Sequence, residues 1–180
     1  MKTLKQMSYY LLGLVFAMGM IACSSDHDPK PDNFGKAEGG FKITTSKDLY
    51  NAINIEAEVI TFKNGVQKVS IDENVVTNLF ETSVNEFPMK ASLSLTMTPK
   101  EGFTIEEGKM YDLSIDIETH STIYDNKDKQ LSSTAKSFHL GSTQDTAEGF
   151  ERWLKQTFNK PITAGIEINK INDNYVITIK

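Results

Sequence analysis

The sequence predicts a mainly β domain, an antiparallel sandwich with one amphipathic helix in its C-terminal half. Three observations indicate this class. Apolar and polar residues alternate over most of the chain after residue 40, turn residues separate the alternating runs, and one later segment has helical spacing. An α+β arrangement, with an antiparallel sheet and two helices, is the alternative. A single globular domain over residues 41–180 suits the length of 180 residues.

The first strands follow from alternation and turn chemistry. Residues 53–59 alternate apolar and polar side chains and are followed by Asn64-Gly65. Asn-Gly between apolar runs predicts a hairpin, with Val69 and Ile71 on the returning strand. Residues 72–87 carry apolar side chains at helical spacing together with the β-branched run 75–77. We predict a short helix over residues 72–87, with a strand as the alternative.

The remaining strands have clearer alternation. Further strands are predicted over residues 91–97, 111–117, 131–140 and 166–179, the last interrupted by a turn at Asn172-Asp173-Asn174. A polar turn is predicted at residues 125–129.

One helix is predicted over residues 145–158, where Phe150, Trp153, Leu154 and Phe158 share one face. Asp145, with Glu148 three residues later, is typical of a helix start. Asn159-Lys160-Pro161 ends the helix. This spacing places Trp153 in the core rather than at a surface site.

The N-terminal segment predicts export. Lys2 and Lys5 precede an apolar run, Tyr9 to Ile21, that is short for a membrane span but suits a signal peptide. Cys23 is the only cysteine, which excludes an intramolecular disulfide or a multi-thiolate metal site.

Met20-Ile21-Ala22-Cys23 resembles the lipobox of bacterial lipoproteins, where a small residue precedes the modified cysteine. The resemblance implies a signal peptide over residues 1–22 and a lipidated Cys23 followed by a flexible tether, residues 23–40 together. Asp26 and Asp28 are similar to the acidic export signal of Bacteroidota surface lipoproteins, or reflect only an acidic tether. The resemblance implies an outer-membrane location, lipid-anchored, on the cell surface or the periplasmic face.

Residues 103–115 resemble a segment of immunoglobulin-like and fibronectin III-like sandwiches, in which a Gly-containing turn precedes a core tyrosine. The resemblance implies an immunoglobulin-like fold. It also implies that the ring of Tyr111 packs in the core while its hydroxyl caps a backbone group. The tryptophan and paired cysteines of antibody domains are absent.

Two histidines are weak candidates for metal binding. His120 and His139 lie on different predicted strands, and if these strands pair the two side chains meet, with Asp116 or Glu118 as a third ligand. Surface histidines are the simpler interpretation, so we predict no metal and no cofactor.

Composition and motifs restrict the classes of function that we expect for this chain. The net charge of −5, without a basic cluster, argues against nucleic acid as a partner. No nucleophile elbow, zincin helix or phosphate-binding loop is present, so we predict that the chain is not an enzyme. The leading hypothesis is a binding or adhesion module for a glycan or an envelope protein. The alternatives are an accessory subunit of an outer-membrane or pilus assembly, joined by strand addition, and an enzyme with an unrecognised site. The sequence singles out no ligand-binding residue.

Overall fold

The computed structural model describes residues 33–71, 75–158 and 160–180. Nine strands are described: β1 (Phe34–Thr45), β2 (Ile53–Ile60), β3 (Val66–Ser70), β4 (Val75–Thr82), β5 (Met89–Pro99), β6 (Ile115–Asp125), β7 (Gln130–Leu140), β8 (Ile162–Ile171) and β9 (Asn174–Ile179). The two described helices are α1 (Lys47–Ala52) and α2 (Ala147–Thr157).

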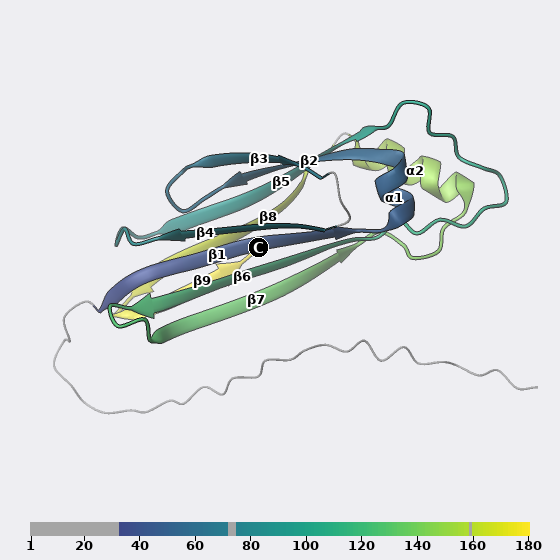
Figure 1. The fold of residues 1–180 in the computed structure, drawn as a ribbon. Helices are drawn as coiled ribbons and strands as arrows, with labels where there is room; N and C mark the ends of the chain where they lie inside the picture. The colour runs from purple at the N-terminus through teal and green to yellow at the C-terminus, as the bar shows by residue number, and fades with distance from the viewer. Residues whose placement is uncertain (1–32, 72–74, 159) are drawn as a thin grey trace, which may run out of the picture. The chain divides into compact units, whose positions relative to one another are not determined.

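The strands form two antiparallel sheets packed as a sandwich (Figure 1). One sheet has the order β4-β1-β6-β7 and the other the order β3-β2-β5-β8-β9. The predicted mainly β sandwich with a helix in its C-terminal half is therefore confirmed. Within this class, the strand order differs from the ABED and CFG sheets of constant-type immunoglobulin domains.

The strands run between two ends of the sandwich (Figure 1). At the first, which we call the turn end, lie the start of β1 and the connections β2–β3, β4–β5, β6–β7 and β8–β9. At the second, the helix end, lie α1, α2 and the long connection from β5 to β6.

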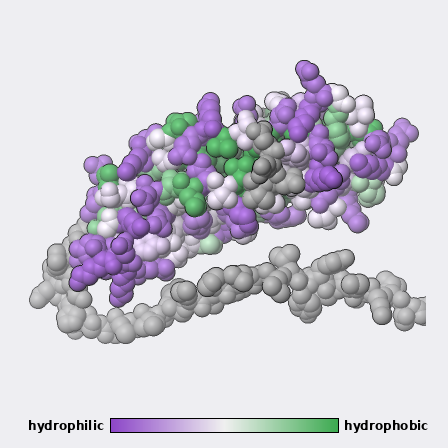
Figure 2. Space-filling model, viewed as in Figure 1, coloured by the Kyte–Doolittle hydropathy of each residue, from purple (hydrophilic) through white to green (hydrophobic). Residues whose placement is uncertain are grey.

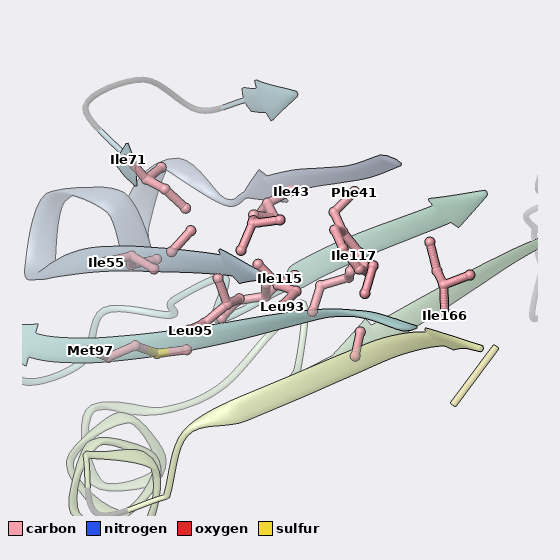
Figure 3. Packing of buried hydrophobic residues seen from close by; sticks show 14 of the residues in the cluster. Phe41, Ile43, Ile55, Ile71, Leu93, Leu95, Met97, Ile115, Ile117 and Ile166 are labelled. Atoms are coloured by element: carbon pink, nitrogen blue, oxygen red, sulfur yellow. The ribbon is translucent and has the colours of Figure 1, made fainter. Parts of the chain in front are cut away.

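The core lies between the sheets and follows from alternation. In β5 the burial alternates residue by residue, so that Leu93 and Leu95 are buried while Ser92 and Ser94 face outward. Figure 3 shows these leucines meeting side chains from the opposite sheet, among them Phe41 of β1 and Ile115 and Ile117 of β6. Burying each such side chain contributes about 1.5–3 kcal/mol, so this interface dominates the stability of the sandwich.

The predicted turns are confirmed, with one correction of geometry. Asn172 and Asp173 have φ of 49° and 61° and join β8 to β9 as a two-residue hairpin. At the β2–β3 turn only Asn64 has a positive φ, 56°, and the N–H of Asn64 donates to the carbonyl of Thr61. This turn is a three-residue loop with its left-handed residue at Asn64, rather than a two-residue Asn-Gly turn.

The prediction that the tether extends to Gly40 is wrong, because β1 begins at Phe34. The glycines of this segment suggested a flexible chain, but Gly39 instead permits an aromatic ring to pack closely against β1. A Cβ on Gly39 would lie 2.7 Å from Cε2 of Phe80. Phe34 is also held in the fold, with its ring centroid 5.6 Å from that of Phe87.

The prediction of a helix over residues 72–87 is wrong for residues 75–87, the part of this segment that the structure describes. Val75–Thr82 forms strand β4, paired antiparallel with β1 in a register that sets Leu79 opposite Gly40. Leu79 is 64% exposed, so it does not share a buried face with Phe80, as the helix would require. Pairing with β1 outweighed the helical spacing. Residues 72–74 lie outside the described part of the chain.

Both helices begin at hydroxyl caps. The Thr146 side chain accepts a hydrogen bond from the N–H of Gly149, so the cap of α2 lies one residue after the predicted cap, Asp145. Helix α1 was not predicted. Its cap is Ser46, whose hydroxyl accepts from the N–H of Leu49 and donates to the carbonyl of Asp112.

Tyr111 lies as the sequence predicts, although regular strand pairing starts later, at Ile115. Its side chain is 1% exposed, and its hydroxyl oxygen lies 2.7 Å from the backbone N of Glu106, which donates to it. Its ring centroid is 4.9 Å from that of Phe150 of α2. The turn before it contains Gly108 at φ 77°, a conformation that suits glycine. Tyr111 thus joins the β5–β6 connection to the helix.

Candidate functional site

The predicted attachment residue Cys23 and the acidic pair Asp26 and Asp28 lie outside the described residues. Over residues 33–71, 75–158 and 160–180, no helix is long and apolar enough to cross a membrane.

The two candidate metal-binding histidines do not meet. Strands β6 and β7 pair, but their register sets His139 opposite Asp116 and His120 opposite Ala135. Nδ1 of His139 lies 2.7 Å from Oδ1 of Asp116, whereas His120 stands four residues farther along β6, about 13 Å away at strand spacing. In the described part of the chain, no three His, Cys, Asp or Glu side chains are grouped to hold a metal ion. The other proposed ligand, Glu118, accepts a hydrogen bond from Lys42 Nζ at 2.7 Å.

Trp153 lies on α2, half-buried and packed against the core cluster, in line with its predicted place on the apolar helix face. The more deeply buried aromatic residue of this face is Phe150, which is 0% exposed.

Exposed hydrophobic residues are scattered. Figure 2 shows one face, on which hydrophilic residues predominate and hydrophobic residues form small patches. The large exposed hydrophobic residues of the described chain come from many elements: Val66, Leu79, Val84, Met110, Leu131, Ile171 and Val176. Scattered residues of this kind are ordinary on a protein surface, so candidate sites must come from concave regions.

A hollow of about 520 Å³ lies at the turn end of the sandwich. The β2–β3 turn forms one side through Phe62, Lys63 and Asn64, and the β4–β5 connection and the start of β5 form the other. We call it the turn-end pocket. Its size is typical of small-ligand sites.

Five of the ten residues that line the turn-end pocket are apolar: Phe62, Val84, Phe87, Pro88 and Met89. Met89 is buried and the rings of Phe62 and Phe87 are half-buried. Both rings are braced from behind. The centroid of Phe62 lies 5.0 Å from that of Phe80 at an interplanar angle of 79°. The centroid of Phe87 lies 5.5 Å from that of Tyr175. Such pairs contribute about 0.5–1.5 kcal/mol each beyond area burial, so the rings are held in place before any ligand arrives.

The other five lining residues of the turn-end pocket are polar and carry both charge signs. Lys63, Asn64, Glu86 and Lys90 are all exposed and line it. The ammonium of Lys90 lies 3.9 Å from Glu167 Oε1. Within the described chain Lys63 and Glu86 take part in no ion pair, so both retain free hydrogen-bonding capacity.

The carboxylate of Glu167, which lies beside this pocket, already has hydrogen-bond partners. It accepts a hydrogen bond from Lys180 Nζ at 2.6 Å, and this bond, with a further one from the Asn169 amide, holds the pKa of Glu167 below its usual value.

A second hollow, of about 320 Å³, lies on the outer face of the first sheet beside Leu79 and His120. Its two carboxylates, Glu38 and Glu81, lie 2.8 and 3.8 Å from the ammonium of Lys36. The hydrogen bond that Lys36 donates to Glu38 raises the pKa of Lys36, so this cation is retained at neutral pH. Because both carboxylates of this hollow are already paired with Lys36, it offers fewer free charged groups to a ligand than the turn-end pocket does.

Three of the edge strands, β3, β4 and β7, carry features that oppose strand addition. Edge strand β3 has five residues and carries Lys68. In edge strand β7, Lys136 occupies an inward-facing position opposite the buried Thr119. Edge strands β4 and β3 are linked by a 2.8 Å hydrogen bond from the Asn78 amide to Gln67. Short edges and inward charges are how natural sheets avoid pairing with other chains.

Comparison of the chain with protein-family models, with curated proteins and with solved structures finds no match. The site therefore rests on its own geometry. Sequence reasoning missed Phe62 and Phe87, because neither belongs to a motif. The available signal was their position, each beside a turn at the same end of the sandwich.

Proposed function

We propose that this chain is a cell-envelope lipoprotein, attached through Cys23, whose sandwich is a non-enzymatic binding module for a glycan or a protein. The observation that carries the binding role is the turn-end pocket, which is lined both by aromatic rings packed against other rings and by charged side chains, two of which, Lys63 and Glu86, are in no ion pair within the described chain.

The anchor is supported by the signal-like segment before Cys23 and by the absence of any other cysteine. Several acyl chains, at about 0.8 kcal/mol per buried methylene, hold a protein on a membrane where one chain does not. Since β1 begins at Phe34, residues 24–33 remain as the spacer. A segment of ten residues reaches at most about 33–36 Å. An outer-membrane location of Bacteroidota type is part of this proposal.

A relation to immunoglobulin-like or fibronectin III-like sandwiches is also proposed. Its support is the buried Tyr111, whose hydroxyl accepts the N–H of Glu106 as in a tyrosine corner.

The pocket lining supports binding rather than catalysis. Among the described residues that form the pocket, Glu86 is the only carboxylate and no histidine, cysteine or serine takes part; the one hydroxyl, that of Thr82, is buried and accepts the N–H of Val84. Glycoside hydrolysis needs two carboxyl groups, and nucleophilic catalysis needs a nucleophile beside a base.

The test uses the intact protein in its native envelope. We expect the protein to fractionate with membranes, and to retain a glycan or a protein in a glycan array and a pull-down. Cys23→Ser is expected to release it from the membrane fraction while leaving the sandwich and its ligand binding unchanged. Empty results in both binding screens would contradict the binding role. Unchanged membrane fractionation of Cys23→Ser would contradict the anchor.

A further inference from the structure

We infer that the turn-end pocket is a carbohydrate-binding site that takes an oligosaccharide with the C–H face of a sugar ring against Phe62 and Phe87. This inference rests on the proposed binding function and names its ligand class.

The lining of the turn-end pocket combines aromatic rings with charged and polar side chains. The sandwich supplies the aromatic rings, and packing against Phe80 and Tyr175 fixes them. An occupant must therefore present an apolar face of its own, with polar groups at its margin. A pyranose ring has this form, because its axial C–H groups make an apolar face and its hydroxyls project from the edge. Aromatic rings attract such C–H groups through the negative potential of their faces.

The polar residues of the lining supply a mixture of hydrogen-bond donors and acceptors. Lys63 donates, Glu86 accepts, and the Asn64 amide does both. Sugar hydroxyls donate and accept, so they satisfy all three side chains. A purely apolar ligand would leave them desolvated and unpaired, at a cost to binding.

The pocket and the start of β1 lie at the same end of the sandwich, and the ring of Phe34, the first residue of β1, contacts Phe87 of the pocket. With the proposed anchor at Cys23, residues 24–33 tie this end to the membrane within about 36 Å. We therefore expect the ligand to be a glycan displayed on the envelope that carries the protein.

The experiment uses the full chain with its anchor, purified in detergent micelles. An array of neutral, amino-sugar and uronic-acid oligosaccharides identifies binders, and calorimetry measures the affinity for the strongest of them. Lys63→Ala and Glu86→Gln remove single exposed groups of the pocket. Lys127→Ala and Glu107→Gln are the matched controls, since both residues are exposed and neither lines the pocket.

We expect each pocket variant to weaken oligosaccharide binding by roughly tenfold, which corresponds to about 1.4 kcal/mol, and the controls to leave it unchanged. Phe62→Leu, which keeps an apolar side chain but loses the aromatic ring, is expected to weaken binding at least as much. Circular dichroism and thermal unfolding verify that each variant is folded.

Three results would overturn the inference. Oligosaccharide binding that is indifferent to all three pocket variants would place the carbohydrate site elsewhere. Binding of a protein or peptide, but of no oligosaccharide, at this pocket would refute the carbohydrate class and leave the proposed binding function standing. Absence of any glycan or protein ligand would contradict both the carbohydrate inference and the proposed binding function.

Discussion

Replacing Tyr111 by phenylalanine tests whether one hydroxyl fixes the β5–β6 connection. The Tyr111 side chain is 1% exposed, and its hydroxyl accepts the N–H of Glu106 at 2.7 Å. Phenylalanine keeps the ring contact with Phe150 but leaves this N–H without its partner. Losing one partner of a buried hydrogen bond costs about 1–3 kcal/mol, so Tyr111→Phe should lower the free energy of unfolding by that amount. For a domain of this size the midpoint should fall by about 2–4 °C per kcal/mol.

Urea unfolding, followed by circular dichroism and analysed with a common slope, measures the difference. Tyr124→Phe is the matched control, because the Tyr124 side chain is only half-buried and its ring interaction with Lys36 survives the change. The control should change stability by less than about 0.5 kcal/mol. Equal stability of Tyr111→Phe and wild type, within the same 0.5 kcal/mol, would refute the role of the hydroxyl.

Two further predictions concern packing and acid stability. Gly39→Ala places a Cβ 2.7 Å from a braced ring and should destabilise by about 1–3 kcal/mol in thermal unfolding, whereas Gly165→Ala, whose nearest neighbour is at 3.6 Å, should be close to neutral. If Gly39→Ala and Gly165→Ala lowered the unfolding temperature equally, the close approach of the Phe80 ring would not require a glycine at position 39. Because Lys180 holds the pKa of Glu167 below its usual value, this ion pair stabilises the fold above the unfolded pKa of Glu167, and the contribution is lost as pH falls through the folded pKa. Lys180→Met should raise the pKa of Glu167 in an NMR titration and narrow the stability difference between pH 7 and strongly acidic solution. An unmoved titration would show that the 2.6 Å contact does not set this pKa.

Local chemistry was enough to predict the turns and the C-terminal helix. Asn172-Asp173 favours positive φ whatever surrounds it, and Phe150 with Phe158 has a period that only a helix buries on one face. Tyr111 was predictable because its short segment, with Gly108, specifies both the turn and the buried ring.

The features that the sequence did not predict depend on contacts between residues far apart in the chain. Val75–Thr82 is a strand because it pairs with β1, and the local sequence does not predict this pairing. The glycines before Phe41 suggested a tether, yet Gly39 is covered by rings from distant parts of the chain. The turn-end pocket joins Phe62 to Phe87 across two separate connections, so only the folded chain brings its residues together.

The most direct test of the proposed lipoprotein is the intact mass of the mature protein extracted from its native membrane. Processing at the lipobox predicts a polypeptide of residues 23–180 that carries acyl groups on Cys23, and the mass of Cys23→Ser should lack those groups. A chain that retains residues 1–22, or that begins at another residue with an unmodified Cys23 thiol, would contradict the proposal.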